Sequence, residues 1–438
     1  MNQKKSYRSA FIVITTLFFL WGFITVLVDS LIPRLRDVFE LSYFQAGLVQ
    51  FAFFGAFFIL SIPAGFILSK IGYKKGIILG LSAMAIGCLM FYPAASFRNF
   101  GIFLAGYFTL AGGITILQVA ANPYVALLGS EDGASSRLNL SQAFNSLGTA
   151  IAPLIGASFL LSDSIKSSEE IAAMTELNRS TYYISEASTV QNPFLLIAAF
   201  IGLLVIFFLF TKLPKLLHDS PRDGYGKLFK NKMVMMGAFG IFVYVGAEVA
   251  IGSYLVNYFL DMNLVSVITE SEMMTALVQL LLNTELSSLD GKAIVGAFVV
   301  FYWSGAMVGR FIGAYLTKII APTKVLLIFA SLAIVMILIS INSQGLVAMW
   351  SILAVGLFNS IMFPTIFTLT LNGLGDLKPQ ASGLLCTAIV GGAIIPPLYG
   401  FLTDEVGFKL ALILLVICYG YILYFAYKKQ KARVLQTT

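Results

Sequence analysis

The feature that most restricts the fold of this chain is a series of apolar runs separated by short polar or charged segments. Each run has about 20 residues or more, the length that a helix needs to cross a bilayer, and within lipid only helices and closed barrels satisfy every backbone group. With 58% hydrophobic and 11% charged residues, the chain is too apolar for a soluble core. We therefore predict an all-α integral membrane protein with twelve transmembrane helices in two six-helix halves. The predicted spans are 9–32, 44–69, 75–96, 98–128, 137–161, 192–213, 231–260, 293–316, 323–342, 345–373, 380–403 and 407–427.

The distribution of Lys and Arg predicts the orientation. The loop at 212–232 and the segment after residue 427 are basic, whereas the two longest loops of the opposite side, 162–191 and 261–291, are acidic. Because basic residues accumulate in cytoplasmic loops, both termini are expected in the cytoplasm of a multi-pass protein of the cell (inner) membrane. The net charge of +7 is explained by these loops, so no nucleic-acid partner is expected. Because the N-terminal lead passes quickly into a full-length span and lacks a small-residue cleavage site, we expect that it is not a removable signal peptide.

A weak internal repeat predicts that the two halves are related. Gln118 precedes Pro123 by five residues in the fourth span, and Asn359 precedes Pro364 by five in the tenth. PLIG in the fifth span corresponds to PLYG in the eleventh. Such duplication is typical of transporters with a site at the membrane midplane. The predicted domains are an N-terminal six-helix bundle at 1–213, a cytoplasmic linker at 214–230 and a C-terminal six-helix bundle at 231–438.

Polar residues inside the spans predict a central cavity. Asp29 lies in an apolar run, where an acidic side chain at a helix centre costs roughly 2.5–3.5 kcal/mol, so it requires a functional explanation. At helical spacing, Thr25 shares a face with Asp29, and similar stripes occur in other spans. The candidate substrate-binding residues are Thr25, Gln118, Asn122, Gln142, Asn145, Glu248, Trp303, Asn359 and Phe363. The candidate cation-coupling residues are Asp29 and Glu248.

This set of side chains favours a monosaccharide over a lipid or a hydrophobic drug. Carboxylates and amides bind adjacent hydroxyl groups, while aromatic faces cover the apolar side of a sugar ring. Each amide could instead form a hydrogen bond that only holds two helices together, and Trp303 could serve helix packing.

Catalytic and metal-binding patterns are absent from the sequence. Cys88, Cys386 and Cys418 lie far apart in apolar runs and are expected to be core residues, and the only histidine, His218, lies in a charged loop. The sequence contains no HExxH pair, no GxSxG elbow and no phosphate-binding loop. We therefore expect neither an enzyme nor a cofactor.

Six segments together carry a family resemblance: WGFITVLVDSLIP, SKIGYKKG, ITILQVAANPYVALLG, RLNLSQAFNSLG, MFPTIFTLTLNGLG and AIVGGAIIPPLYG. With them the chain resembles the fucose/galactose/glucose symporters of the major facilitator superfamily over nearly its whole length. LQVAANPY, GAEVAIGSYLVNY and GGAIIPPL make it more similar to the glucose/galactose branch than to the L-fucose/proton symporters. The resemblance implies cation-coupled uptake of a hexose of the glucose/galactose type by alternating access.

The resemblance also implies roles for single residues. Asp29 matches the helix 1 aspartate that fucose symporters use in proton coupling, and Asn145 matches a sugar-cavity asparagine. Phe363 falls where that branch has a cavity tyrosine. Two positions differ from the pattern: Gln118 replaces a glutamate essential in the fucose symporters, and Ser69 replaces the usual aspartate of the inner-loop signature.

The coupling ion stays open at this level. A buried carboxyl such as Asp29 could load and release a proton, or hold Na⁺ among neutral oxygens. Because Gln118 cannot take up a proton at ordinary pH, we favour a sodium ion near Asp29. The expected partners are a monosaccharide, the co-transported Na⁺ or H⁺ and the bilayer, and the protein is expected to be a monomer. The alternatives are an L-fucose/proton symporter, an exporter of another small solute and a sugar sensor.

Overall fold

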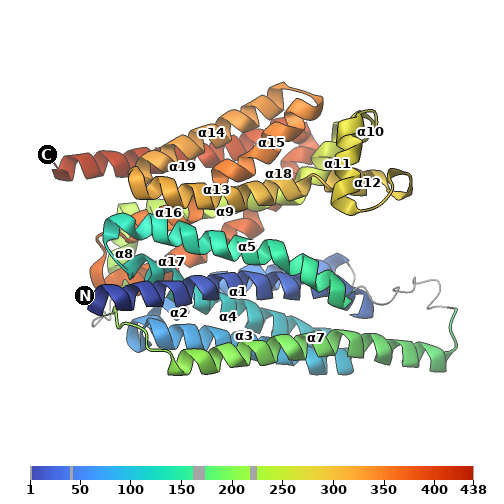
Figure 1. Ribbon diagram of the computed structural model, residues 1–438, viewed down its shortest axis with the longest axis horizontal. Helices are drawn as coiled ribbons and strands as arrows, with labels where there is room; N and C mark the ends of the chain where they lie inside the picture. The colour runs from blue at the N-terminus through green and yellow to red at the C-terminus, as the bar shows by residue number, and fades with distance from the viewer. Residues whose placement is uncertain (1, 40–42, 161–172, 218–223, 438) are drawn as a thin grey trace. The chain divides into compact units, whose positions relative to one another are not determined.

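The computed structural model describes residues 2–39, 43–160, 173–217 and 224–437 (Figure 1). Within these ranges, all regular elements are helices. Eleven stretches in the described part of the chain are long and apolar enough to cross a membrane, each corresponding to one of the predicted spans. The remaining predicted span, 137–161, is helical as α5 (Ala134–Leu160). The three cysteines are buried, as expected, whereas His218 lies outside the described residues.

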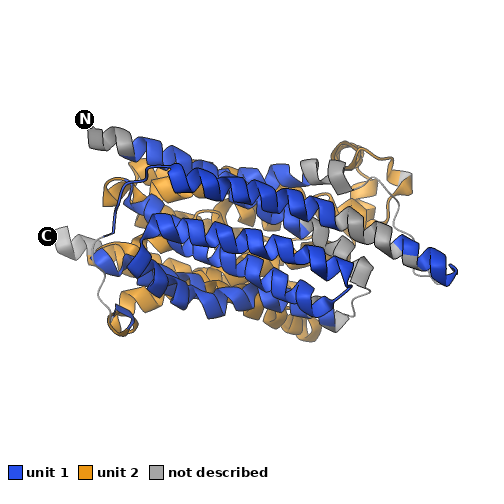
Figure 2. Cartoon of the chain, turned by 90° about the horizontal axis from the view of Figure 1, so that it is seen from below, with its two compact units in different colours: residues 1–128, 144–225, 374–387 blue, residues 129–143, 226–373, 388–438 orange. Residues whose placement is uncertain are grey.

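The helices form two compact units, which Figure 2 distinguishes by colour. Unit 1 consists of residues 1–128, 144–225 and 374–387, and unit 2 of residues 129–143, 226–373 and 388–438. α5 contributes its first ten residues to unit 2 and the rest to unit 1. The helices of unit 1, besides this part of α5, are α1 (Asn2–Phe39), α2 (Tyr43–Ile71), α3 (Tyr73–Ser96), α4 (Phe100–Leu127), α7 (Glu176–Phe210) and α17 (Lys378–Thr387).

Close packing of α3 against α4 forms the centre of unit 1. Gly80 and Gly87 on α3 face Gly113 and Gly106 on α4, each pair separated by seven residues, or about two helical turns. A Cβ atom at Gly113 would lie 2.5 Å from the backbone nitrogen of Met84. Because apolar side chains gain little from association within lipid, membrane helices rely on small residues that allow such close contact.

α17 joins unit 1 although it lies far along the chain. Gly65 on α2 and Gly383 on α17 approach so closely that a Cβ atom at Gly65 would lie 3.2 Å from the Cα atom of Gly383. The Tyr225 hydroxyl, in α8 (Gly224–Lys230), donates a hydrogen bond of 2.6 Å to the Ile62 carbonyl. Burial raises the pKa of this hydroxyl above its usual range, so it remains a donor at physiological pH.

Unit 2 contains the end of α8 and the remaining helices. Among them, α9 (Lys232–Asp261) contacts α13, α15, α16, α18 and α19. The others are α10 (Leu264–Thr269), α11 (Glu272–Leu282), α12 (Gly291–Gly296), α13 (Val299–Ile319), α14 (Pro322–Asn342), α15 (Gly345–Asn359), α16 (Met362–Leu371), α18 (Gly391–Val406) and α19 (Phe408–Thr437). Two side-chain hydrogen bonds connect the first part of α5 to α16 within this unit. They join Ser135 to Thr368 at 2.7 Å and Asn139 to Thr365 at 3.1 Å.

Several elements differ in length from the sequence prediction. The tenth predicted span is interrupted at residues 360–361, between α15 and α16, because Pro364 cannot donate a backbone hydrogen bond to Ser360. The eleventh predicted span consists of α17, a short 3₁₀ turn at Ala388–Val390 and α18. The two predicted outer loops also contain helix: α7 begins at Glu176, and α10 and α11 lie between residues 261 and 291.

The glycine packing leads to a prediction of stability. Gly113→Ala should lower the free energy of unfolding by about 1–3 kcal/mol, because its methyl group overlaps the backbone of α3. Gly202→Ala on α7 is the matched control: no atom lies within 4 Å of the added Cβ, so it should gain up to about 1 kcal/mol from helix propensity. Thermal unfolding of both variants in detergent measures the difference, and equal midpoints would contradict the packing argument.

Candidate functional site

Asp29 lies on α1 and remains accessible at the surface of unit 1. The hydroxyl of Tyr107, on α4, donates a long hydrogen bond of 3.4 Å to its Oδ1 atom. Thr25, one turn earlier, donates its hydroxyl hydrogen to the Trp21 carbonyl at 2.9 Å and is thus bonded within its own helix. Asp29 therefore keeps capacity to accept a proton or contact a cation.

Asn145 connects α5 to α1. Its side-chain nitrogen donates a hydrogen bond of 2.9 Å to the Phe18 carbonyl, across a contact that requires Gly22: a Cβ atom there would lie 2.7 Å from the same nitrogen. For Asn145, the structure therefore shows the hydrogen bond between two helices that was the alternative to sugar binding for each amide. The Asn145 oxygen makes no hydrogen bond with any described residue, so it can still accept one from a ligand.

Gln118 and Asn122 lie one turn apart on α4 but in different surroundings. Asn122 is fully buried. Gln118 is half-buried, and its side chain makes no hydrogen bond within the described part of the chain. An amide with this freedom is suited to a polar ligand.

Pro123 frees a carbonyl beside Gln118. A proline has no N–H, so the carbonyl four residues earlier, that of Val119, lacks its usual helical donor. The hydroxyl of Ser382, on α17, donates a hydrogen bond of 2.8 Å to this carbonyl oxygen. Leaving it unsatisfied in a membrane would cost several kcal/mol.

Unit 2 repeats the arrangement with different side chains. Pro364 leaves the Ser360 carbonyl without a helical donor, and the Nε atom of Arg310 donates to it at 3.2 Å. Asn359 directly precedes this carbonyl, as Gln118 precedes that of Val119. The repeat in the sequence thus corresponds to a repeated structure. In each unit a proline leaves one backbone carbonyl without its helical donor, and the residue before that carbonyl has an amide side chain.

Glu248 is the carboxylate of unit 2. It lies in the middle of α9, accepts a hydrogen bond of 2.7 Å from the Tyr244 hydroxyl and forms an ion pair with Arg310 on α13 at 3.6 Å. The side chains of Glu248 and Arg310 are only 14% and 17% exposed. Arg310 was not among the residues predicted from the sequence, although an arginine inside the predicted span 293–316 has an insertion cost like that of Asp29 and could have indicated it.

Asn359 holds three helices of unit 2 together. It is fully buried, and its side-chain nitrogen donates to the hydroxyls of Tyr302 on α13 at 2.8 Å and Tyr419 on α19 at 3.1 Å. Tyr302 in turn donates to the Glu248 backbone carbonyl at 3.3 Å. Asn359 therefore positions the helices that carry Glu248 and Arg310.

The remaining candidates lie in unit 2 and are mainly packing residues in this structure. Phe363 is 9% exposed and stacks on Phe367, with ring centres 5.7 Å apart. Trp303 is 48% exposed and meets Tyr302 edge to face at 5.0 Å. Gln142 is buried in the part of α5 that belongs to unit 2, whereas Asn145 belongs to unit 1. The two candidates on α5 are therefore divided between the units.

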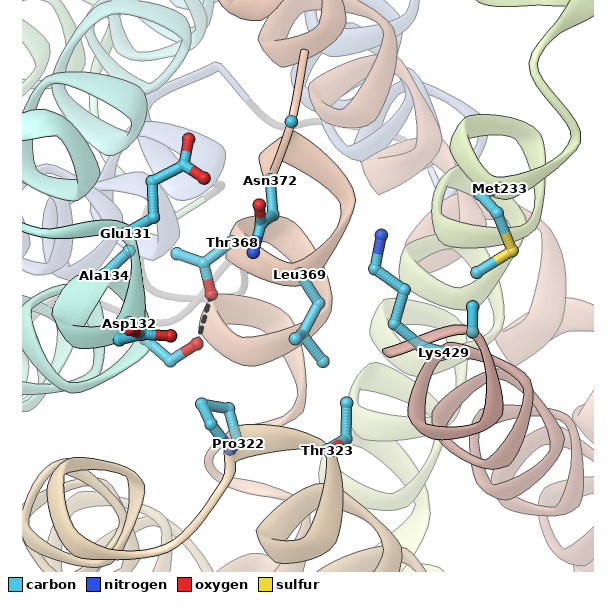
Figure 3. Close-up of a pocket in the computed structure, with 13 residues that line it drawn as sticks. Glu131, Asp132, Ala134, Met233, Pro322, Thr323, Thr368, Leu369, Asn372 and Lys429 are labelled. Atoms are coloured by element: carbon cyan, nitrogen blue, oxygen red, sulfur yellow. Dashed lines mark hydrogen bonds between the residues drawn. The ribbon is translucent and has the colours of Figure 1, made fainter. Parts of the chain in front are cut away.

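A cavity of about 400 Å³ lies at the helix ends of unit 2, apart from these candidates (Figure 3). The Ser135–Thr368 hydrogen bond lies on its wall. Its polar lining residues include Glu131, Asp132, Thr323, Asn372 and Lys429. None of the residues singled out from the sequence lines it.

The ion pair of unit 2 can be tested by a double-mutant cycle. Glu248→Gln and Arg310→Gln should each lower the free energy of unfolding by about 3 kcal/mol, because each leaves a charge without its partner in a low-dielectric interior. The double variant should lose much less than the sum of the two, because it leaves neither charge behind. Thermal unfolding in detergent provides the measurement, and additive losses would show that the two side chains do not interact.

Comparison with known proteins agrees with these features. The sequence model of the Major Facilitator Superfamily matches residues 9–389 of this chain. The chain is 46% identical to the glucose/galactose transporter of Brucella abortus biovar 1 (strain 9-941), with 97% of this chain and 95% of the relative covered. It is 35% identical to the L-fucose-proton symporter of Escherichia coli (strain K12), covering 97% and 94%.

A crystal structure of the E. coli fucose:proton symporter superposes with a TM-score of 0.85 at 32% identity, covering 97% of this chain and 99% of that one. Both the fold and the sequence thus match transporters over nearly the full length. The chain is a multi-pass membrane protein that belongs to the Major Facilitator Superfamily, in the group that includes these sugar transporters.

Proposed function

We propose that this protein is a secondary active transporter of the cell inner membrane that carries a hexose of the glucose/galactose type together with Na⁺ or H⁺. The observation that carries this proposal is that each unit has a carboxylate on a spanning helix that accepts a hydrogen bond from a tyrosine: Asp29 from Tyr107 and Glu248 from Tyr244. Amide side chains accompany both. Such groups inside a membrane mark ion and substrate pathways. The names of the relatives support the choice of a sugar.

The proposed topology has twelve spans, with α5 as the fifth and both termini in the cytoplasm. The N-terminal half is then 1–213, the linker 214–230 and the C-terminal half 231–438. The basic segments on one side of the spans support this orientation.

In the proposed mechanism, unit 1 provides the clearest ligand-binding groups. Gln118 donates and accepts hydrogen bonds to sugar hydroxyls, and the Asn145 oxygen accepts one more. Thr25 and Asn122 would form outer parts of the site in this unit. The candidates of unit 2 are proposed as substrate-binding residues of that unit.

Asp29 is proposed as the main cation site because Glu248 already has a cationic partner in Arg310. A carboxylate with only a long hydrogen bond from a neutral tyrosine gains more from Na⁺ or H⁺ than one that is already neutralised by a guanidinium group. Sodium remains our first choice, since Gln118 supplies a neutral oxygen and not a second carboxyl.

Alternating access requires that some contacts form in only one state. Residues 129–143 belong to the proposed N-terminal half but pack in unit 2, and residues 374–387 belong to the C-terminal half but pack in unit 1. The bonds of these segments, Ser135 with Thr368 and Ser382 with the Val119 carbonyl, are proposed to break when the site opens to the cytoplasm.

Uptake into proteoliposomes tests the proposed function directly. Glucose, galactose, mannose and fucose are offered separately, each driven by a sodium gradient or by a proton gradient. Sodium-driven accumulation of glucose or galactose is the expected result. Proton-driven accumulation of fucose alone would favour the L-fucose/proton symporter, to whose E. coli representative the chain is 35% identical. Failure of all four sugars, in counterflow as well, would overturn sugar transport.

Asp29→Asn should abolish concentrative uptake while leaving sugar counterflow measurable, because coupling depends on its charge and not on its size. The control is Asp261→Asn, the same change at an exposed position at the end of α9, which should transport like the unmodified protein. Accumulation at the normal level in the Asp29 variant would contradict its role in coupling.

Gln118→Ala should weaken sugar binding roughly threefold to tenfold, the value of one hydrogen bond of about 0.5–1.5 kcal/mol. Its thermal stability should be unchanged, because the side chain has no hydrogen-bond partner among the described residues. Asn359→Ala is the comparison: it loses two internal bonds and should be less stable. An unchanged dissociation constant for Gln118→Ala by calorimetry would remove Gln118 from the site.

A further inference from the structure

α11 (Glu272–Leu282) carries an apolar stripe that no part of the described protein covers. Met273 is 74% exposed and Leu280, two turns later on the same face, is 78% exposed. Ala276 lies between them on that face and is also exposed. A stripe of this kind on a helix indicates contact with an apolar environment.

The position of α11 in the chain places it at the membrane surface. The spans 232–261 and 291–319 flank it, so the segment between them begins and ends at the same side of the bilayer. With 11 residues, α11 is about 16 Å long, which is far shorter than the hydrocarbon core of roughly 30 Å. Figure 1 shows α10, α11 and α12 grouped together in unit 2.

The helix has three distinct faces. Met274 and Val278, one turn apart, are fully buried and point toward the protein. Glu272 and Gln279, seven residues apart, form an exposed polar face. At 100° per residue, the stripe of Met273, Ala276 and Leu280 is the third face, between the polar and the buried ones.

Local bonds fix the orientation of these faces. The Thr275 hydroxyl donates to the Ile268 carbonyl of α10 at 3.1 Å. Ser271 caps the first turn by accepting from the Met274 amide, and Asn283 ends the helix in the left-handed conformation, with φ of 49°. Because α10 and α11 are joined in this way, the apolar stripe cannot turn inward without breaking them.

We propose that α11 lies in the membrane interface, with Met273, Ala276 and Leu280 inserted among the lipid headgroups and upper acyl chains on the side where α9 ends and α12 begins. The polar face then meets water and the buried face meets α10. A bilayer is the occupant that fits, because the flanking spans hold the segment at its surface. α11 has no Lys or Arg, so apolar burial and not anionic lipid drives its insertion. The assignment does not depend on the transported substrate.

Single-cysteine labelling tests this placement in the full-length protein. A fluorophore is attached to Met273→Cys or Leu280→Cys and, as matched controls, to Glu272→Cys or Gln279→Cys on the polar face of the same helix. The three native cysteines are buried, and labelling of the unmodified protein measures their background. The protein is reconstituted into phosphatidylcholine vesicles with brominated acyl chains, and iodide serves as the aqueous quencher.

The expected result is blue-shifted emission, quenching by the brominated lipid and protection from iodide at positions 273 and 280, with the reverse at 272 and 279. Adding phosphatidylglycerol should leave this pattern unchanged. Iodide quenching at all four positions would overturn the proposal in favour of a solvated helix. Protection of 273 and 280 without lipid quenching, together with cross-linking between two copies, would instead identify a protein interface and also overturn it.

Discussion

The lack of hydrogen-bonding partners within a bilayer is the constraint on which the rest of this structure depends. Every backbone carbonyl that leaves the helical pattern must find another donor. Pro123 and Pro364 each free one carbonyl, and the donors are Ser382 on α17 and Arg310 on α13. The two donor helices, α17 and α13, therefore lie beside the candidate residues Gln118 and Asn359 that precede the freed carbonyls.

The same constraint distinguishes the two candidate carboxylates, Glu248 and Asp29. Glu248 has an arginine and a tyrosine as partners and is connected through Tyr302 to the buried Asn359. Among the residues that the structure describes, Asp29 has only the distant hydroxyl of Tyr107 as a partner. A carboxylate with few partners responds most strongly to an arriving cation, so the proposed division of work gives coupling mainly to unit 1 and a prearranged polar framework to unit 2.

Close packing between helices explains how these polar contacts are held in place. Glycines bring α3 to α4 and α2 to α17 within backbone contact, as Gly113 and Gly65 do. A rigid pair such as α3 with α4 moves as one body, which suits a carrier that must break a small set of bonds, such as Ser135 with Thr368, without unfolding.

The sequence by itself determined the helical class, eleven of the spans and the paired positions of Gln118 and Asn359, because hydrophobic length and residue spacing are local properties. It also singled out Asp29 as a candidate, because the cost of a buried charge is local as well. It did not determine which side chains meet. Only the tertiary structure paired Glu248 with Arg310, turned Asn359 into a buried brace and divided α5 between the units. The first two outcomes depend on contacts between residues about 60 positions apart, and the third on where a helix passes from one packed unit to the other. The periodicity of residues along one helix carries no information about either.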